Sequence, residues 1–178
     1  MLKKIAIVVV VAIAAFLAFA ATKPDTFQVQ RSTVIKAPPD KIFALIQDFH
    51  HWGVWSPYEK RDPDMKRTYG GPESGKGSMY AWEGNSKVGA GRMEILDATA
   101  PSKVTIKLDF IKPFESTSAT EFTFKPAAVN GTAVTWTMSG RQGFMQKAFC
   151  MFMDMDAMVG KDFEKGLAQM KKAAEAMR

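Results

Sequence analysis

Polar side chains that could carry out chemistry are few in this sequence. His50 and His51 are adjacent at the end of an apolar helical pattern, and Cys150 is the only cysteine. No acid or cysteine stands at a recognisable catalytic spacing from either histidine, which favours capping or solvation of a helix end over acid–base catalysis. Cys150 lies among apolar residues and is predicted to be an inert core residue. The pattern predicts no catalytic residue.

Motifs for metals, phosphates and nucleic acids are also missing from the sequence. It contains no H-x-x-x-H or C-x-x-C pair, and the glycine-rich segment 70–77 lacks the final Ser or Thr of a phosphate loop. The net charge is +6, but the basic residues are scattered apart from Lys171 and Lys172. We therefore expect no metal, no cofactor and no nucleic-acid partner.

Large apolar side chains form the more informative pattern, because they suit a cavity for a small molecule. Methionine adapts to the shape of its neighbours, and Gly91 withholds a side chain from an otherwise apolar strand face. The same residues would also suit an ordinary core, since both environments bury an aromatic ring. The candidate cavity residues are Trp52, Trp55, Tyr80, Trp82, Gly91, Met93, Leu108, Phe110, Phe122, Trp136, Met153, Met155 and Met158.

The segment 144–178 is predicted to be the long helix that closes one side of this cavity. Its first turns are rich in Met and Phe, and an apolar stripe then recurs at steps of three and four. We expect this stripe to pack against the concave face of an antiparallel sheet. The stripe consists of Val159, Phe163, Gly166, Leu167, Met170, Ala174 and Met177.

Alternating apolar and polar residues predict the strands of that sheet. A strand over 27–36 is interrupted by Arg31 on its apolar face, and Pro38 and Pro39 end it. A short helix to Phe49 and a second short helix or turn over 50–58 follow. Six further strands are predicted at 65–69, 78–83, 88–97, 103–111, 115–125 and 132–139, which makes the fold class α+β.

Particular segments resemble a known family. A-P-P-D-K-I-F-A-L-I-Q-D-F followed by W-G-V-W-S-P-Y, and later W-E-G-N, V-G-A-G-R-M-E-I and K-D-F-E-K-G-L, are similar to the polyketide cyclase/dehydrase and lipid-transport group of the START-like SRPBCC superfamily. The resemblance covers about 27–176 and implies a helix-grip fold, a curved seven-stranded antiparallel sheet around a long C-terminal helix. Because this superfamily contains binders, carriers and enzymes, the resemblance implies the fold more strongly than the function.

The first 22 residues have the pattern of a membrane segment. Lys3 and Lys4 precede an apolar run over 5–21, which as a helix spans about 25 Å. The run fits a signal anchor, and Ala18-Phe19-Ala20 also fits a cleavable signal. Its length favours the anchor. We expect a leader at 1–22, a linker at 23–26 and an extracytoplasmic domain at 27–178, with secretion after cleavage as the alternative.

The combined pattern predicts a domain that binds or carries a small hydrophobic or lipid-like ligand between its sheet and its last helix, tethered at a membrane. One alternative is a cyclase- or hydratase-like enzyme that uses the same cavity. Another is a ligand-free interaction module on the membrane. The sequence identifies neither the ligand nor the oligomeric state.

Overall fold

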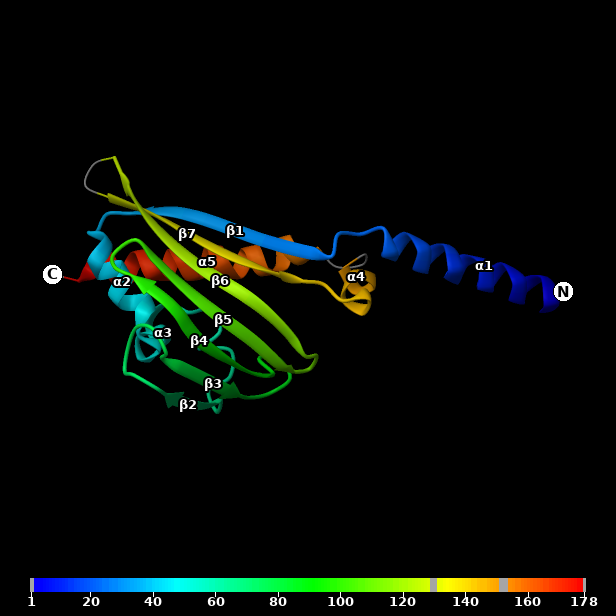
Figure 1. Cartoon of the computed structure of the whole chain (residues 1–178), viewed down its shortest axis with the longest axis horizontal. Helices are drawn as coiled ribbons and strands as arrows, with labels where there is room; N and C mark the ends of the chain where they lie inside the picture. Colours follow the sequence, from blue (N-terminus) through cyan, green and yellow to red (C-terminus); the bar gives the residue numbers. More distant parts are fainter. Residues whose placement is uncertain (1, 129–130, 151–153, 178) are drawn as a thin grey trace.

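A computed structural model describes residues 2–128, 131–150 and 154–177 of the chain (Figure 1). Up to the end of β7, helices and strands follow one another in the order that the sequence predicts. The elements are α1 (Leu2–Ala21), β1 (Thr26–Ile35), α2 (Pro39–Gln47), the 3-10 helix η1 (Phe49–His51), α3 (Trp52–Trp55), β2 (Lys66–Gly70), β3 (Met79–Glu83), β4 (Ala90–Thr99), β5 (Lys103–Lys112), β6 (Ser116–Ala127), β7 (Gly131–Arg141), α4 (Phe144–Cys150) and α5 (Met155–Ala176).

The seven strands form one antiparallel sheet in the order β1-β7-β6-β5-β4-β3-β2. The first strand of the chain pairs with the last, from Thr26 opposite Arg141 to Ile35 opposite Thr132. The sheet curves, and α5 runs along its inner face (Figure 1). The predicted α+β helix-grip fold is confirmed. We refer to residues 26–177, which form the sheet and the helices packed on it, as the body.

The apolar stripe of α5 is buried against the sheet. Phe163, Leu167, Met170 and Ala174 are all at most 1% exposed. Phe163 stacks on Trp136 of β7, with ring centroids 3.9 Å apart and planes 8° from parallel. One turn further on, Gly166 of α5 faces the same indole. The two ends of the predicted stripe are less buried than its middle. Val159 is half-buried, and Met177, which is 40% exposed, lies just after the end of α5.

The two short helices close one end of the body. Pro39 stands at the first turn of α2, and the helix buries Ile42, Phe43, Leu45 and Ile46. The indole N–H groups of α3 then donate hydrogen bonds back to α2 carbonyl oxygens. Trp52 donates to Ile46 at 3.0 Å and Trp55 donates to Leu45 at 2.9 Å. Both tryptophans therefore have satisfied polar atoms while their rings fill the core.

Arg31 of β1 clamps the start of α5. Its Nε donates to Glu164 at 2.8 Å, and its Nη2 donates to the carboxylate of Asp156 at 2.8 Å. Hydrogen bonds to Asp156 and Glu164 raise the pKa of the guanidinium, and the hydrogen bond from Arg31 lowers the pKa of Asp156. Gly160 makes room for this clamp, since a Cβ there would lie 2.0 Å from Nη2. The residue that interrupts the strand pattern is therefore a partner of α5.

The long helix begins later than the sequence predicts. The expectation of one helix over 144–178 is wrong, because the structure has two helices, α4 and α5. Asp154 has extended backbone angles and caps α5, where its side chain accepts a hydrogen bond from the Ala157 N–H at 2.9 Å. This cap satisfies a backbone donor that a continuous helix would pair internally. Residues 151–153 lie outside the described part of the chain.

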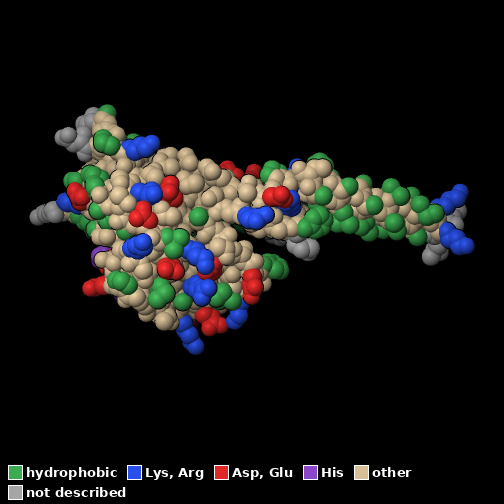
Figure 2. Space-filling view, in the orientation of Figure 1, with side chains coloured by type: hydrophobic (Ala, Val, Ile, Leu, Met, Phe, Trp, Pro, Cys, Tyr) green, Lys and Arg blue, Asp and Glu red, His purple; other side chains and the backbone are tan. Residues whose placement is uncertain are grey.

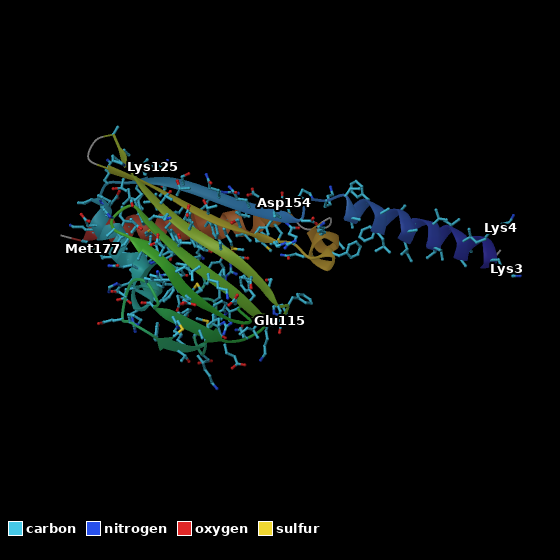
Figure 3. The ribbon with its side chains drawn as sticks, in the orientation of Figure 1. Lys3, Lys4, Glu115, Lys125, Asp154 and Met177 are labelled. Carbon is cyan, nitrogen blue, oxygen red and sulfur yellow. The ribbon has the colours of Figure 1, made fainter. Side chains whose placement is uncertain are left out.

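The first helix projects from the body (Figure 1). Residues Lys3–Ala21 of α1 are long and apolar enough to cross a membrane, and 6% of this segment is buried. Hydrophobic side chains cover α1 in the space-filling view, and Lys3 and Lys4 lie at its far tip (Figures 2 and 3). At its other end α1 contacts α4, and Asp25 forms an ion pair with Lys147 of α4. These contacts set the direction in which α1 leaves the body.

Truncation of Phe163 tests the packing of α5. Phe163→Ala should lower the free energy of unfolding by about 3–5 kcal/mol, because it removes a fully buried ring from a close-packed stack. Denaturant unfolding of the full chain measures the loss. Lys165→Ala, on the exposed face of the same helix, is the control and should change stability by less than about 0.5 kcal/mol. A larger loss for Lys165→Ala would contradict the orientation of α5.

A double-mutant cycle tests the clamp. In the wild-type chain, Gly160→Ala would displace the Arg31 guanidinium and break its ion pairs, which offsets the better helix propensity of alanine. In an Arg31→Leu background this clash is removed, so Gly160→Ala should stabilise by up to about 1 kcal/mol. Denaturant melts of the four proteins give the coupling. Equal effects of Gly160→Ala in both backgrounds would show that Arg31 does not occupy this position.

Candidate ligand-binding site

Four of the predicted cavity residues form a closed aromatic cluster inside the grip. Trp52, Trp55, Phe122 and Trp136 are at most 5% exposed. Their rings contact one another, with centroid distances of 4.8 Å between Trp52 and Trp55, 5.5 Å between Trp55 and Trp136 and 5.0 Å between Phe122 and Trp136. This half of the interior, which lies against α3 and the middle of α5, is packed side chain against side chain.

A second group of predicted residues lies on β3, β4 and β5. Trp82 stacks on Tyr80 at 6.1 Å and meets Phe110 edge to face at 6.0 Å. A Cβ on Gly91 would lie 2.4 Å from the indole of Trp82, so the ring occupies the space that this glycine leaves. The expectation of free space beside Gly91 is therefore wrong. Glycine is needed there because an aromatic side chain crosses the strand closely.

Exposure of the interior rises steadily towards one end of the body. Along the inner face of β5, Ile106 is 0% exposed, Leu108 is 9% exposed and Phe110 is only half-buried. Along the apolar stripe of α5, Phe163 is 1% exposed and Val159 is only half-buried. Both trends run in the same direction in space, towards the β5–β6 turn and the start of α5, near Glu115 and Asp154 in Figure 3. The grip is closed at the α3 end and open at the other.

The remaining strands show the same trend. On β7, Trp136 is 3% exposed and Met138 is 8% exposed, and on β1, Val29 is 2% exposed while Phe27 is half-buried. We call the partly exposed apolar residues where these trends meet the open end. The open end consists of Phe27, Trp82, Phe110, Met155 and Val159.

Small side chains lie between the closed cluster and the open end. In the sheet register, Phe27 is opposite Gly140, Gly140 is opposite Ser118, and Ser118 is opposite Leu108. Met93 is opposite Leu108 and 8% exposed. This row thus offers two small residues in the middle of an otherwise apolar surface. The ring of Phe27 and the hydroxyl of Ser118 occupy the space beside Gly140, where a Cβ would lie 2.9 Å and 3.0 Å from them.

One buried donor in the interior has no partner. The indole Nε1 of Trp136 has no hydrogen-bond acceptor within the described residues. Gly166 approaches the Cζ3 edge of this indole, so the N–H points away from Gly166, on the opposite edge of the ring system. A buried N–H without an acceptor costs free energy, which an acceptor on a ligand or a water molecule would recover.

Ionisable groups near the interior are already engaged. Tyr80 donates its hydroxyl to Glu59 at 2.5 Å, and the Nε of Arg67 donates to the same carboxylate at 2.7 Å. Burial, followed by the hydrogen bond to Glu59, raises the pKa of Tyr80. Burial likewise raises the pKa of Tyr58, which lies beside Asp162. These groups join the loop after α3 to the sheet and to α5. No sequence pattern pointed to Glu59, because its partners are distant along the chain.

The two histidines lie at the surface, where only His51 contacts a carbonyl oxygen of α2. The Nδ1 of His50 lies 2.7 Å from the Asp48 carboxylate, and the Nδ1 of His51 lies 3.2 Å from the Ala44 carbonyl oxygen. The side chains are 48% and 52% exposed. Among the described residues, no three His, Cys, Asp or Glu side chains gather as a metal site requires.

The remaining predicted residues differ in position. Met155 is half-buried and lies at the start of α5 at the open end. The expectation that Met158 lines the interior is wrong, because it is 44% exposed and stands about 140° around the helix from Phe163. Met153 lies outside the described residues.

An open groove of about 990 Å³ crosses the sheet beside α4, and Phe27, Ser118 and Gly140 of the inner row also border it. Gln28, Leu96 and Lys107 line it, and these residues alternate with the buried inner rows, so this groove lies largely on the outer face.

Comparison with solved structures shows the same fold in distant proteins. Protein Ms6760 from Mycobacterium smegmatis matches with a TM-score of 0.59 and 18% identity, over 88% of this chain and 96% of that one. Protein SA2116 from Staphylococcus aureus matches with a TM-score of 0.61 and 16% identity, over 84% and 94%. The Aha1 dimer from Colwellia psychrerythraea matches with a TM-score of 0.59 and 16% identity, over 84% and 97%. At these identities the likeness concerns the fold alone.

A comparison with curated proteins finds no significant match. The family model described as "Polyketide cyclase / dehydrase and lipid transport" matches residues 26–175, from the first residue of β1 almost to the end of α5. This range takes in the whole sheet, the closed cluster and the open end. The chain therefore belongs to the polyketide cyclase/dehydrase and lipid transport family, within the SRPBCC superfamily.

Proposed function

We propose that the body binds one small apolar, lipid-like molecule between the sheet and α5. The observation that carries this proposal is the rise in exposure along the inner face, from Ile106 at 0% through Leu108 at 9% to half-buried Phe110. An apolar surface that is continuous from a closed core to solvent favours an apolar guest, because the guest removes that surface from water. Membership of a family described in part by lipid transport supports the same class of ligand.

The chemistry of the interior further defines the ligand. Aromatic and methionine side chains at the open end accommodate a long hydrocarbon or isoprenoid-like chain. Trp136 offers one buried donor without an acceptor in the described residues, which favours a ligand that carries a hydrogen-bond acceptor. We therefore propose a chain with one acceptor group, such as a carboxyl, carbonyl or ester oxygen.

We also propose that α1 remains as a signal anchor and keeps the body on the extracytoplasmic side of a membrane. Support comes from the exposed, uniformly apolar segment Lys3–Ala21 and from Lys3 and Lys4 at its tip, since positive residues favour the cytoplasmic side. On this proposal, residues 1–22 form the anchor, 23–26 form the linker and 27–178 form the binding domain. The molecule would then act as a tethered binder or carrier at the membrane surface.

Ligand binding can be measured with the full chain in lipid nanodiscs. Titration with dibrominated stearic acid should quench tryptophan fluorescence saturably and raise the melting temperature with ligand concentration. All four tryptophans lie in the body. Trp82→Phe should remove a large share of the quenching, because Trp82 is the tryptophan at the open end.

Matched substitutions on α5 sharpen this test. Val159→Phe narrows the open end and should weaken binding by about tenfold, whereas Ala168→Phe adds the same ring on the exposed face and should bind like the wild type. Absence of saturable quenching and of any thermal shift in the wild-type chain would reject the ligand site and favour the interaction module.

The anchor makes a separate prediction. The full chain should stay in the membrane fraction after alkaline carbonate washing and should keep its Met-Leu-Lys-Lys terminus. Val9→Lys combined with Ile13→Lys should release it, because each charge near the centre of a span costs about 2.5–3.5 kcal/mol. Fractionation and N-terminal sequencing provide the measurement. Recovery of a soluble chain that begins near Ala21 would establish cleavage and secretion instead.

A further inference from the structure

We propose that the open end of the body rests on the lipid bilayer, with Phe114 and Phe144 inserted at its surface, and that the ligand is a membrane lipid that enters the grip directly from the bilayer. This inference rests on the proposed function, because it requires both a ligand site and an anchored α1. It adds the surface through which the ligand passes and the source from which the ligand comes.

Exposed apolar side chains mark this surface. Phe114, in the turn between β5 and β6, is 80% exposed, the highest value for a large apolar side chain among the described residues. Ile111 at the end of β5 is 48% exposed and Phe144 at the start of α4 is 44% exposed. Because the Phe114 ring buries little surface in the fold, a partner that removes it from water accounts for its presence better than the fold does.

These side chains lie on the side of the body from which α1 leaves. Glu115, the neighbour of Phe114, is labelled at this end in Figure 3, and α4 lies beside the end of α1 in Figure 1. Ala20 of α1 is 0% exposed, and the Gln142 N–H donates to the Asp25 carbonyl oxygen at 2.8 Å. The last turn of α1 is therefore held against the body.

The length of the connection keeps this end close to the membrane. Residues 22–25 separate α1 from β1, and four residues span at most about 14 Å. One headgroup layer is about 5–8 Å deep. When α1 spans the bilayer, the start of β1 is thus held within about one to two headgroup depths of the hydrocarbon, and α4 contacts α1 beside it. The sheet register brings the start of β6 to the same level, because Phe27 is opposite Gly140 and Gly140 is opposite Ser118.

The charge at the tip of the turn is compatible with this contact. Lys112 and Glu115 flank Phe114 with opposite signs, and Lys112 is paired with Glu83 at 2.9 Å. Aromatic rings are favoured at the level of the headgroups, where their apolar surface leaves water without entering the bilayer centre. The open end lies at the same end of the body. A lipid chain leaving the bilayer therefore meets the apolar interior without crossing bulk water.

Spin labels test the contact in the full chain reconstituted in phosphatidylcholine vesicles. The lone cysteine is first replaced by Cys150→Ala, and a nitroxide is attached at Phe114→Cys or at Lys125→Cys. Lys125 is exposed and lies at the opposite end of the body in Figure 3. The label at position 114 should be accessible to oxygen and shielded from a water-soluble nickel chelate, and the label at position 125 should show the reverse. Equal aqueous exposure of the two labels would overturn the proposal. Dipolar broadening between labels at position 114 would also overturn it, because a second copy of the chain would then cover this surface.

A kinetic measurement that keeps Cys150 provides an independent test. Phe114→Asp and Phe144→Asp should slow loading with dibrominated stearic acid from the vesicle bilayer by about tenfold or more, the factor expected when one buried phenylalanine contact is lost. The quenching reached at equilibrium should not change. Val54→Asp replaces a residue of α3 that is 53% exposed, at the closed end, and should load at the wild-type rate. Wild-type rates in both phenylalanine variants would overturn the membrane contact while leaving the ligand site intact, whereas absence of quenching in every protein would reject the proposed function itself.

Discussion

The close contact between α5 and β7 decides the shape of this protein. Phe163 stacks on Trp136 at 3.9 Å, and Gly166 lets the helix approach so closely that a Cβ there would lie 2.8 Å from the same indole. A helix that rests this near to the sheet leaves no room between them at this level, and the aromatic cluster around Trp55 and Phe122 completes the closure. The part of the interior that reaches solvent therefore lies beyond Phe163, towards the start of α5.

The clamp at Arg31 acts at the boundary between the closed and the open parts. It joins β1 to Asp156 and Glu164, which flank the turn of α5 that carries Gly160. A bidentate guanidinium contact fixes both the distance and the rotation of the helix start. The methionines that precede it then project beyond the last buried turn. Charge pairing thus positions the apolar side chains that form the open end.

Family membership establishes the fold of this protein, whereas the side chains of the interior indicate the class of ligand. The family includes carriers and enzymes, so the fold alone does not choose between them. The described ionisable groups nearest the interior, such as Glu59 with Arg67 and Tyr80, serve as hydrogen-bonded supports. The interior contributes apolar surface, the small residues Ser118 and Gly140, and the donor of Trp136. These groups are suited to bind an apolar molecule that carries one hydrogen-bond acceptor, which is the basis of the proposed function.

The sequence by itself determined the elements, because their signals are local. Alternation along the strands and the steps of three and four along α5 record which face of each element is buried, and the register follows from that alternation. Most of the stripe of α5 and all seven strands could therefore be predicted. The tertiary structure alone decided which of the apolar residues are closed core and which are open. Trp82 fills the space beside Gly91, and Arg31 meets Asp156 and Glu164, which follow it by 125 and 133 residues. Such pairings leave no periodic trace in the chain, since they depend on how elements distant in sequence come together in space.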